Sequence, residues 1–482
     1  MTGPVTAGAQ ELEAALASFV KDNRLYGATA GVVHGDELAW SAGAGFADAA
    51  ARRPSSVDGL YRVASITKTF TGTAIMQLRD AGKLGLDDPV AHWIPELAAT
   101  TGAGPVEAVT VRRLLSHESG LISESPGTDW SALPPAYEGL FERGLARAGE
   151  IFTAVPPNTQ VKYSNLGYQL LGEIVQRVSG VGYPQYVRER ILAPLGLVGT
   201  TFDPAADGLA SRCATGYTGR AFTDELTVAP QVTEISADGG LWSSVPDLAR
   251  WVSFQLAAHA EAHPEATGQE AASPAATQSP ADQRAQSGEV LAAATRREMH
   301  KPRYLVDDEW RSALGVSWFG TRDDEVIWFG HSGSLHGFIS AICFDPKARV
   351  GSVVLLNGEA SAPDLARRLG GIARRLVQAS PPLVTLPMPT PEEYRALLGL
   401  YATADMSGVV RLEWRDGKLV FVDPEEPTYR IVLEPSGEKD AFTVAPGVRA
   451  SGEMARFRRL PTGAVASVFV GGGTLLRLDP VR

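Results

Sequence analysis

Five prolines between residues 380 and 391 separate two parts of this chain that differ in their hydrophobic pattern. Proline fixes the backbone angle φ and lacks an amide hydrogen, so a run of this kind is typical of a semi-rigid connector. At 482 residues the chain is also longer than a single hydrophobic core usually supports. We therefore expect two domains, at 1–380 and 392–482, joined by a linker at 381–391.

The part before the prolines mixes strand and helix patterns. Residues 27–47 are predicted to form a β-hairpin with its turn at 34–36. Further strands are predicted at 326–330 and 338–357, followed by an amphipathic helix at 362–379. Strands from both ends of this region, covered by helices, indicate an α+β fold with a central antiparallel sheet.

A stretch of low hydrophobicity interrupts the first domain at residues 257–289. It contains no Val, Ile, Leu, Phe, Tyr, Trp or Met. Such a segment cannot bury enough apolar surface to offset the entropy lost on ordering, so it is predicted to be a mobile surface insertion. The one His-x-x-x-His pair of the sequence, His259 and His263, falls within it and is interpreted as solvated.

After the linker, apolar and polar residues alternate. Val410, Leu412 and Trp414 alternate with polar residues, and Asp416-Gly417 is a typical hairpin turn. Similar alternating segments follow at regular spacing to the end of the chain. The pattern predicts an all-β module of about 90 residues, either a small barrel or a sandwich.

Ser65 and Lys68 form the first of three motifs that carry chemistry. Phe70, Ala74 and Leu78 recur at four-residue spacing, which predicts a helix that begins near Ser65, with Lys68 one turn further along. The unpaired N–H groups and the positive dipole end of a helix N-terminus favour negative charge on Ser65. Lys68 can accept the Ser65 proton if burial and positive surroundings favour its neutral amine.

Tyr163-Ser164-Asn165 is the second motif. It stands directly before a predicted helix, whose apolar face is formed by Leu166, Leu170, Ile174 and Val178. In a functional interpretation, the Tyr163 phenol relays a proton, while the Asn165 amide donates to a substrate carbonyl or holds the lysine. The structural alternative is a helix cap with a packed tyrosine beside it.

His331-Ser332-Gly333-Ser334 is the third motif, and it follows the strand predicted at 326–330. Gly333 allows a ligand backbone to approach closely, because glycine has no Cβ. The N–H of Ser334 could join that of Ser65 in an oxyanion hole. The structural alternative is a strand end made of small residues.

Taken together, the three motifs resemble those of the serine β-lactamase and penicillin-recognising family. They occur in the family's order, separated by roughly 95 and 165 residues. Because Tyr-x-Asn stands where the class A branch has Ser-Asp-Asn, the similarity is to the class C branch and its DD-peptidase, D-aminopeptidase and esterase relatives. Two further stretches, 114–121 and 239–248, are also similar to this family. The resemblance covers about residues 10–380, and the C-terminal module resembles the extra domain of several peptidase relatives.

The resemblance implies a sheet flanked by helices, an all-helical lobe, and a site between them. It implies that Ser65 attacks a carbonyl, that Lys68 and Tyr163 move protons, and that Asn165 contacts the substrate and the lysine. By the same resemblance, His331 and Gly333 line the opposite wall, where the amide of Ser334 joins that of Ser65 around the oxyanion.

The clearest departure from the family pattern is His331, which occupies a position where β-lactamases have lysine. A neutral imidazole attracts a substrate carboxylate less than a permanent ammonium does. We therefore expect a serine hydrolase that forms an acyl-enzyme on an amide, D-peptide or ester. A D-aminopeptidase, DD-carboxypeptidase or esterase is favoured over an efficient β-lactamase.

Composition excludes several other classes. Lys and Arg total 44 and Asp and Glu total 55, and the resulting net charge of −11 disfavours nucleic acid or an anionic membrane as partner. Two cysteines and scattered histidines predict no disulfide, no metal and no cofactor. No signal peptide or membrane span is recognised, so the expected location is cytoplasmic. A small molecule or short peptide is the expected substrate, and a homo-oligomer is left open.

Two alternatives compete with this prediction. An α/β-hydrolase needs Gly-x-Ser-x-Gly, and the nearest match, residues 330–334, lacks the last glycine. A non-catalytic ligand sensor or scaffold with the same fold remains the alternative. The three motifs argue against this alternative, because a scaffold does not require a lysine one turn from an exposed serine.

Overall fold

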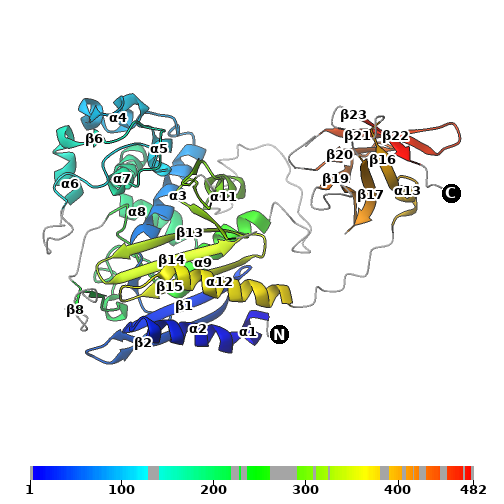
Figure 1. The fold of residues 1–482 in the computed structure, drawn as a ribbon. Helices are drawn as coiled ribbons and strands as arrows, with labels where there is room; N and C mark the ends of the chain where they lie inside the picture. The colour runs from blue at the N-terminus through cyan, green and yellow to red at the C-terminus, as the bar shows by residue number, and fades with distance from the viewer. Residues whose placement is uncertain are drawn as a thin grey trace. The chain divides into compact units, whose positions relative to one another are not determined.

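The computed structural model describes residues 4–128, 140–218, 227–229, 236–260, 290–307, 311–323, 326–379, 390–403, 409–415, 417–422, 430–445, 453–470 and 473–478. The chain forms two compact units, Met1–Ser380 and Pro381–Arg482 (Figure 1). Residues 381–389 of the predicted linker and 261–289 of the predicted insertion lie outside the described residues.

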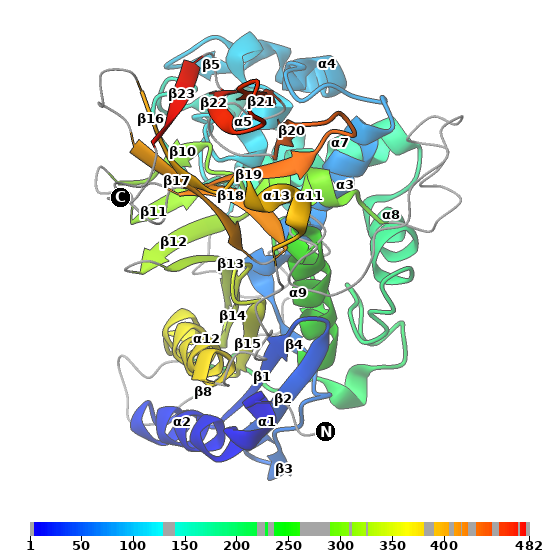
Figure 2. The same cartoon turned by 90° about the vertical axis from the view of Figure 1, so that its right-hand side faces the viewer.

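The centre of the first unit is a nine-stranded antiparallel sheet in the order β10-β11-β12-β13-β14-β15-β1-β2-β3. Its strands are β1 Gly27–His34, β2 Glu37–Asp48, β3 Arg53–Pro54, β10 Tyr304–Leu305, β11 Ser312–Leu314, β12 Phe319–Asp323, β13 Val326–Leu335, β14 Phe338–Asp345 and β15 Val350–Leu356. The predicted hairpin is present as β1–β2. The two ends of the domain meet where β1 pairs with β15, with Ala30 opposite Val354 (Figure 2).

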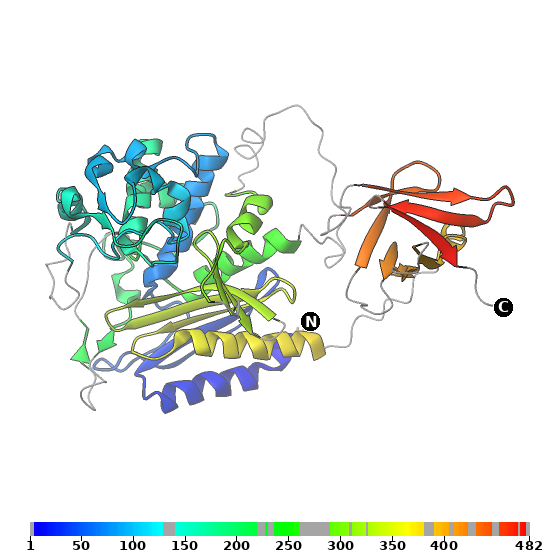
Figure 3. The ribbon, with the colours of Figure 1, turned by 45° about the horizontal axis from the view of Figure 1, so that its top comes forward.

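Helices cover both faces of this sheet. On one face lie α1 Pro4–Ala7, α2 Ala9–Asp22 and α12 Ala362–Ala379 (Figure 3). They pack on apolar side chains that include Ala30 and Val32 of β1. On the other face lie α9 Val245–Ala260 and α11 Ala293–His300. The helix predicted at 362–379 is confirmed as α12. Its buried residues recur at helical spacing and include Leu365, Ala366, Leu369, Ile372 and Ala373.

A helical lobe stands beside the sheet. It contains α3 Thr67–Asp80, α4 Val90–Trp93, α5 Val111–Leu115, α6 Leu140–Leu145, α7 Asn165–Ser179 and α8 Tyr183–Val187. The helix α7 begins where the Ser164 side chain accepts a hydrogen bond from the Gly167 N–H at 3.0 Å, and it ends at Gly180, whose φ of 73° suits glycine.

Short elements connect these parts. The paired two-residue strands are β4 Tyr61–Arg62, β5 Thr101–Gly102, β6 Phe152–Thr153, β7 Tyr217–Thr218, β8 Thr227–Val228 and β9 Trp242–Ser243. The short helical turns are η1 Ala64–Ile66, η2 Pro95–Ala99, η3 Val106–Ala108, η4 Ala148–Glu150, η5 Arg188–Leu192 and η6 Ala210–Arg212.

The second unit is a closed eight-stranded barrel, which decides between the barrel and the sandwich left open by the sequence. After α13 Glu392–Arg395, its strands are β16 Gly399–Ala402, β17 Val409–Arg415, β18 Lys418–Val422, β19 Arg430–Pro435, β20 Ala441–Val444, β21 Met454–Arg459, β22 Val465–Val470 and β23 Gly473–Leu478. Side chains such as Tyr401, Leu412, Phe421 and Phe457 form its buried core.

Two sequence-based boundaries were wrong. Residues 257–260 do not start an insertion, because they complete α9, where alanines favour the helix without adding apolar bulk. His259 is therefore in a helix, with its Nε2 2.9 Å from Nδ1 of His300. The strand predicted at 326–330 continues to Leu335, because residues 331–335 pair with β14.

Among the described residues, no helix combines the length and apolar character needed to cross a bilayer. In that same part of the chain, no three His, Cys, Asp or Glu side chains gather as metal ligands.

Candidate active site

Ser65 lies in η1, directly before the first residue of α3. Its side chain is partly exposed, whereas the neighbouring Ala64 and Ile66 are buried. Ala64 has a φ of 45°, which is unusual for a residue with a side chain and is typical of strained backbone at functional sites. Ser65 is thus presented at the N-terminal end of a helix, where the local dipole favours negative charge.

Lys68 is fully buried behind Ser65. Its Nζ lies 3.0 Å from Oγ of Ser65, 2.7 Å from Oδ1 of Asn165 and 2.7 Å from the carbonyl oxygen of Asp238. An ammonium group has three donors, and each of them here has an acceptor. The structure therefore fixes the lysine nitrogen next to the serine oxygen.

Asn165 is the first residue of α7, and its amide is held from both ends. Oδ1 accepts from Lys68, and Nδ2 donates to Oε1 of Glu124 at 2.8 Å. Because both partners are charged groups of opposite sign, they define which way the amide points. A hydrogen-bonded chain thus runs from Ser65 through Lys68 and Asn165 to Glu124.

Tyr163 lies beside this chain of contacts but does not join it. The centre of its ring is 5.0 Å from Nζ of Lys68. Among the described residues, the Tyr163 hydroxyl makes no hydrogen bond to Ser65 or Lys68. Catalytic hydrogen bonds in ligand-free enzymes are often long and tighten only when substrate binds. The Tyr163 ring is therefore a neighbour of Lys68, and its phenol makes no hydrogen bond to the pair in this structure.

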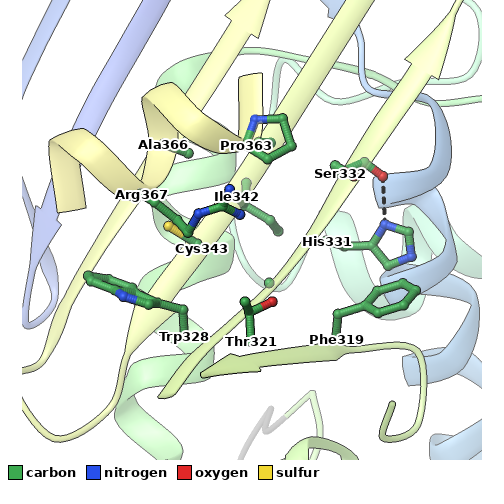
Figure 4. Close-up of a pocket in the computed structure, with 12 residues that line it drawn as sticks. Phe319, Thr321, Trp328, His331, Ser332, Ile342, Cys343, Pro363, Ala366 and Arg367 are labelled. Atoms are coloured by element: carbon green, nitrogen blue, oxygen red, sulfur yellow. Dashed lines mark hydrogen bonds between the residues drawn. The ribbon is translucent and has the colours of Figure 1, made fainter. Parts of the chain in front are cut away.

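His331 lies within β13 and is buried. Its Nδ1 donates to the Ser332 carbonyl oxygen at 2.7 Å, and its ring packs 5.3 Å from that of Phe319 (Figure 4). Burial, and then the positive charge of Lys68, lowers the pKa of His331 to about 3. The imidazole is thus neutral near pH 7 and carries its proton on Nδ1.

Gly333 and Ser334 follow on the same strand. A Cβ at Gly333 would lie 3.0 Å from the Cβ of Ala64 and closer still to the Val63 carbonyl oxygen. The close approach predicted for a ligand backbone is thus made by the chain's own backbone, next to Ser65. Pairing of β13 with β12 ends at Gly330, so Ser334 has only β14 as a strand partner among the described residues.

A cavity of about 190 Å³ opens on the α12 side of the sheet (Figure 4). Phe319, Trp328, Cys343 and Arg367 line it, and it reaches His331 and Ser332. Ser65, Lys68, Tyr163 and Asn165 are not among its lining residues. It is therefore distinct from the cluster around Ser65.

Sequence reasoning missed two partners of the site, Glu124 and Asp238. Glu124 lies in a loop without a motif, and Asp238 acts through its backbone carbonyl, for which sequence carries little signal. The stretch 239–248, which follows Asp238, is similar to the family but indicated no role. His117, in the similar stretch 114–121, is interpreted from sequence as a hydrogen-bonded structural residue and not as a metal ligand.

Comparison with curated proteins finds relatives that match part of the chain. Beta-lactamase-like protein 2 of Dictyostelium discoideum is 32% identical over 273 residues, which are 55% of this chain and 48% of that protein. Protein flp of Staphylococcus aureus strain MW2 is 26% identical over 348 residues, 72% of this chain and 63% of that protein. The chain thus spans about half the length of the first relative and less than two thirds of the second.

Solved structures share the fold. An octameric penicillin-binding protein homologue from Pyrococcus abyssi has a TM-score of 0.62 at 23% identity, covering 97% of this chain and 99% of that one. SurE has a TM-score of 0.56 at 23% identity, covering 99% of this chain and 100% of that one. A class C beta-lactamase has a TM-score of 0.59 at 19% identity, covering 78% of this chain and 97% of that one.

A family model described as Beta-lactamase matches residues 12–376. The match includes the serine, the buried lysine and the strand that faces them. Since it extends over more than half of the 482 residues, this chain belongs to the beta-lactamase family.

Proposed function

We propose that this protein is a serine hydrolase that forms an acyl-enzyme on Ser65. The observation that supports it most is the position of the buried Nζ of Lys68, 3.0 Å from Oγ of Ser65. A lysine enclosed at this distance from a partly exposed serine can take up the serine proton. The structural alternative, a lysine on the protein surface one turn from a capping serine, does not fit, because Lys68 is fully buried.

Acylation follows from this geometry. For this step Lys68 must first release one of its three ammonium protons to solvent. Oγ of Ser65 then bonds to the substrate carbonyl carbon while its proton passes to Nζ of Lys68. The N–H groups of Ser65 and Ser334 stabilise the resulting oxyanion. When the intermediate collapses, the bond to the leaving amine or alcohol breaks, and the proton held by Lys68 reaches that group through Tyr163.

In deacylation, water is the nucleophile and Oγ of Ser65 is the leaving group. The oxygen of a water molecule bonds to the acyl carbon, and the bond between this carbon and Oγ of Ser65 breaks. One proton of the water is transferred to Oγ of Ser65, which restores the hydroxyl. The products are a carboxylic acid and the free serine, so no cofactor is consumed. Asn165 holds Lys68 in place through both steps.

His331 directs the choice of substrate. Its neutral imidazole provides no permanent positive charge for a substrate carboxylate. Peptidase, amidase or esterase activity is therefore favoured over efficient β-lactam hydrolysis. D-configured residues are candidate substrates, and the related fold of SurE has been determined with D-Leu.

Turnover of p-nitrophenyl esters and D-amino-acid p-nitroanilides tests the proposal. Ser65→Ala is expected to abolish turnover and to leave the melting temperature within about 2 °C of wild type, since only one partly exposed hydroxyl is lost. Ser332→Ala, on an exposed strand position, is the matched control and keeps full activity. Turnover by Ser65→Ala above a few per cent of wild type would assign the nucleophile to another residue.

The assembly state is a separate part of the proposal. The Pyrococcus abyssi homologue, which spans both units of this chain, is described as octameric. We expect this chain to form a homo-oligomer as well. Light scattering coupled to size exclusion gives the molar mass, and a mass near 51.1 kDa would identify a monomer instead.

A further inference from the structure

His117 holds the backbone on both sides of Tyr163. The N–H of Lys162 donates to the His117 carbonyl oxygen at 2.7 Å. The N–H of Ser164 donates to Nδ1 of His117 at 3.1 Å. One residue therefore fixes the peptide groups immediately before and after the tyrosine.

The same residue also supports the side chain of Tyr163. The two rings lie 4.1 Å apart between their centres and are tilted by 31°. On its other side, the His117 ring lies 5.0 Å from that of Tyr168, whose hydroxyl is 2.7 Å from both the Leu115 carbonyl oxygen and Oγ of Ser317. The tyrosine ring thus rests on a support that is itself anchored in the helical lobe.

Two features of His117 are energetically unfavourable: its backbone conformation and an unpaired polar group of its ring. Its φ is 55°, a left-handed conformation uncommon for histidine. Because Nδ1 accepts from an N–H, the neutral ring must carry its proton on Nε2, and this buried N–H has no hydrogen-bond partner among the described residues. Burial, and then the charge of Lys68, lowers the pKa of His117 well below its usual value. A left-handed φ and an unsatisfied buried N–H both cost stability, so other contacts of His117 must offset them.

We propose that His117 is a positioning residue, which sets the place of the Tyr163 phenol relative to Ser65 and Lys68. This inference rests on the proposed function, because it concerns the proton transfer assigned to Tyr163. His117 is only 1% exposed and acts through Tyr163 without touching substrate. Its neutral form is required, since a protonated Nδ1 could no longer accept from Ser164.

Two single variants separate the contacts of His117. His117→Phe keeps a ring against Tyr163 and removes the acceptor for the Ser164 N–H. His117→Asn removes the ring and keeps an acceptor, and asparagine tolerates positive φ. For p-nitrophenyl ester hydrolysis we expect His117→Phe to lower kcat about 100-fold, the cost of misplacing a catalytic group by about 1 Å, with KM within about threefold. We expect His117→Asn to recover at least about tenfold of that loss.

A double-mutant cycle with Tyr163→Phe tests whether His117 acts through the tyrosine. If it does, His117→Phe has no further effect on kcat once the Tyr163 hydroxyl is absent. Losses that multiply in the double variant would show an effect independent of Tyr163 and overturn the inference. A wild-type kcat in His117→Phe, with only a lower melting temperature, would overturn it as well.

A second measurement does not need activity. Tyrosines labelled with 3-fluorotyrosine give ¹⁹F resonances, and the signal lost in Tyr163→Phe identifies that of residue 163. We expect His117→Phe to shift and broaden this signal, because the ring gains alternative positions. An unchanged signal would contradict the inference. Failure of the proposed function would appear differently, as a wild-type protein without turnover whose Tyr163 signal still depends on His117.

Discussion

The two walls of the site differ in what holds them. The helical wall is formed by Ser65, Lys68, Tyr163 and Asn165. Side-chain hydrogen bonds from the buried amine of Lys68 join Ser65 and Asn165, and the ring of Tyr163 lies beside them. The strand wall, formed by His331, Gly333 and Ser334, consists of one β-strand packed against the Ser65 turn, with a neutral ring as its main polar side chain.

This difference suits the two walls to different roles in the proposed function, which are proton transfer on the helical wall and substrate selection on the strand wall. In the proposed function, proton transfer needs groups held at hydrogen-bonding distance, as Ser65 and Lys68 are on the helical wall. Substrate alignment needs backbone groups and a suitable charge, and the proposal assigns both to the strand wall. Changes on the helical wall should therefore act on the rate of the chemical step. Changes on the strand wall should act on packing and on which substrates are used.

The largest effect is expected at the centre of the helical wall. Lys68→Met removes the amine that accepts the Ser65 proton and should lower kcat/KM about 1,000-fold, within the range found for positioned acid–base groups. Ester hydrolysis under pseudo-first-order conditions measures it. Lys162→Met is the control, because its Nζ contacts Ser123 and not Ser65. A decrease of less than about tenfold in Lys68→Met would assign proton transfer elsewhere.

On the strand wall, Gly333→Ala is expected to act through packing. The new Cβ would meet the Val63 carbonyl oxygen and Ala64, and overpacking of this kind costs about 1–3 kcal/mol of the free energy of unfolding. Urea denaturation measures the change. Gly320→Ala is the matched control on β12, where the nearest atom to a new Cβ is Phe329 Cε1 at 3.5 Å. Equal stability of the two variants would show that β13 does not press on the Ser65 turn.

Buried histidines give the stability of the protein a pH dependence. Burial is the main cause that lowers the pKa of His117 and His331, and also that of His300 beneath the sheet. Below about pH 6.5 the unfolded chain then binds more protons than the folded chain, so the free energy of unfolding falls as pH falls. Each histidine contributes up to about 1.4 kcal/mol per pH unit until its folded pKa is reached.

Urea denaturation at pH 7.5, 6.0 and 5.0 checks this dependence. His117→Phe removes the histidine behind the helical wall, and His331→Gln removes the histidine of the strand wall. Each should reduce the slope by the share of one histidine. The same slope in both variants as in wild type would mean that neither ring is held neutral by folding.

The smallest effect is expected for charge on the strand wall. His331→Lys introduces a permanent cation opposite Lys68, and His331→Gln is its neutral control. We expect the lysine variant to raise kcat/KM for carboxylate-bearing substrates about tenfold relative to neutral esters, which corresponds to about 1.4 kcal/mol. Competition between a matched ester pair gives the ratio. A ratio equal to that of His331→Gln would remove His331 from substrate selection.

Much of the fold followed from periodicity in the sequence. The helix at 362–379, the hairpin at 27–47 and the separate β-module were predicted because strong amphipathic or alternating patterns define them. The Ser65–Lys68 contact was expected because three residues span about one helical turn. These features depend on local sequence, which a single chain reveals.

The features that could not be predicted depend on long-range contacts. Residues 331–335 look like a loop because they are small or polar, yet pairing with β14 extends the strand through them. The carbonyl of Asp238 reaches Lys68 across 170 residues, and the Ser164 N–H reaches His117 across 47. Backbone groups have no residue-specific signature, so their place at the site could not be predicted from sequence.

The central claim is that the buried Lys68 makes Ser65 nucleophilic. Mass spectrometry after brief incubation with a fluorophosphonate tests it most directly, with wild type, Ser65→Ala and Lys68→Met compared in parallel. The account predicts one adduct per chain on Ser65 in wild type, none in Ser65→Ala, and labelling slower by at least about 100-fold in Lys68→Met. An adduct on another residue, or equal labelling rates in wild type and Lys68→Met, would contradict it.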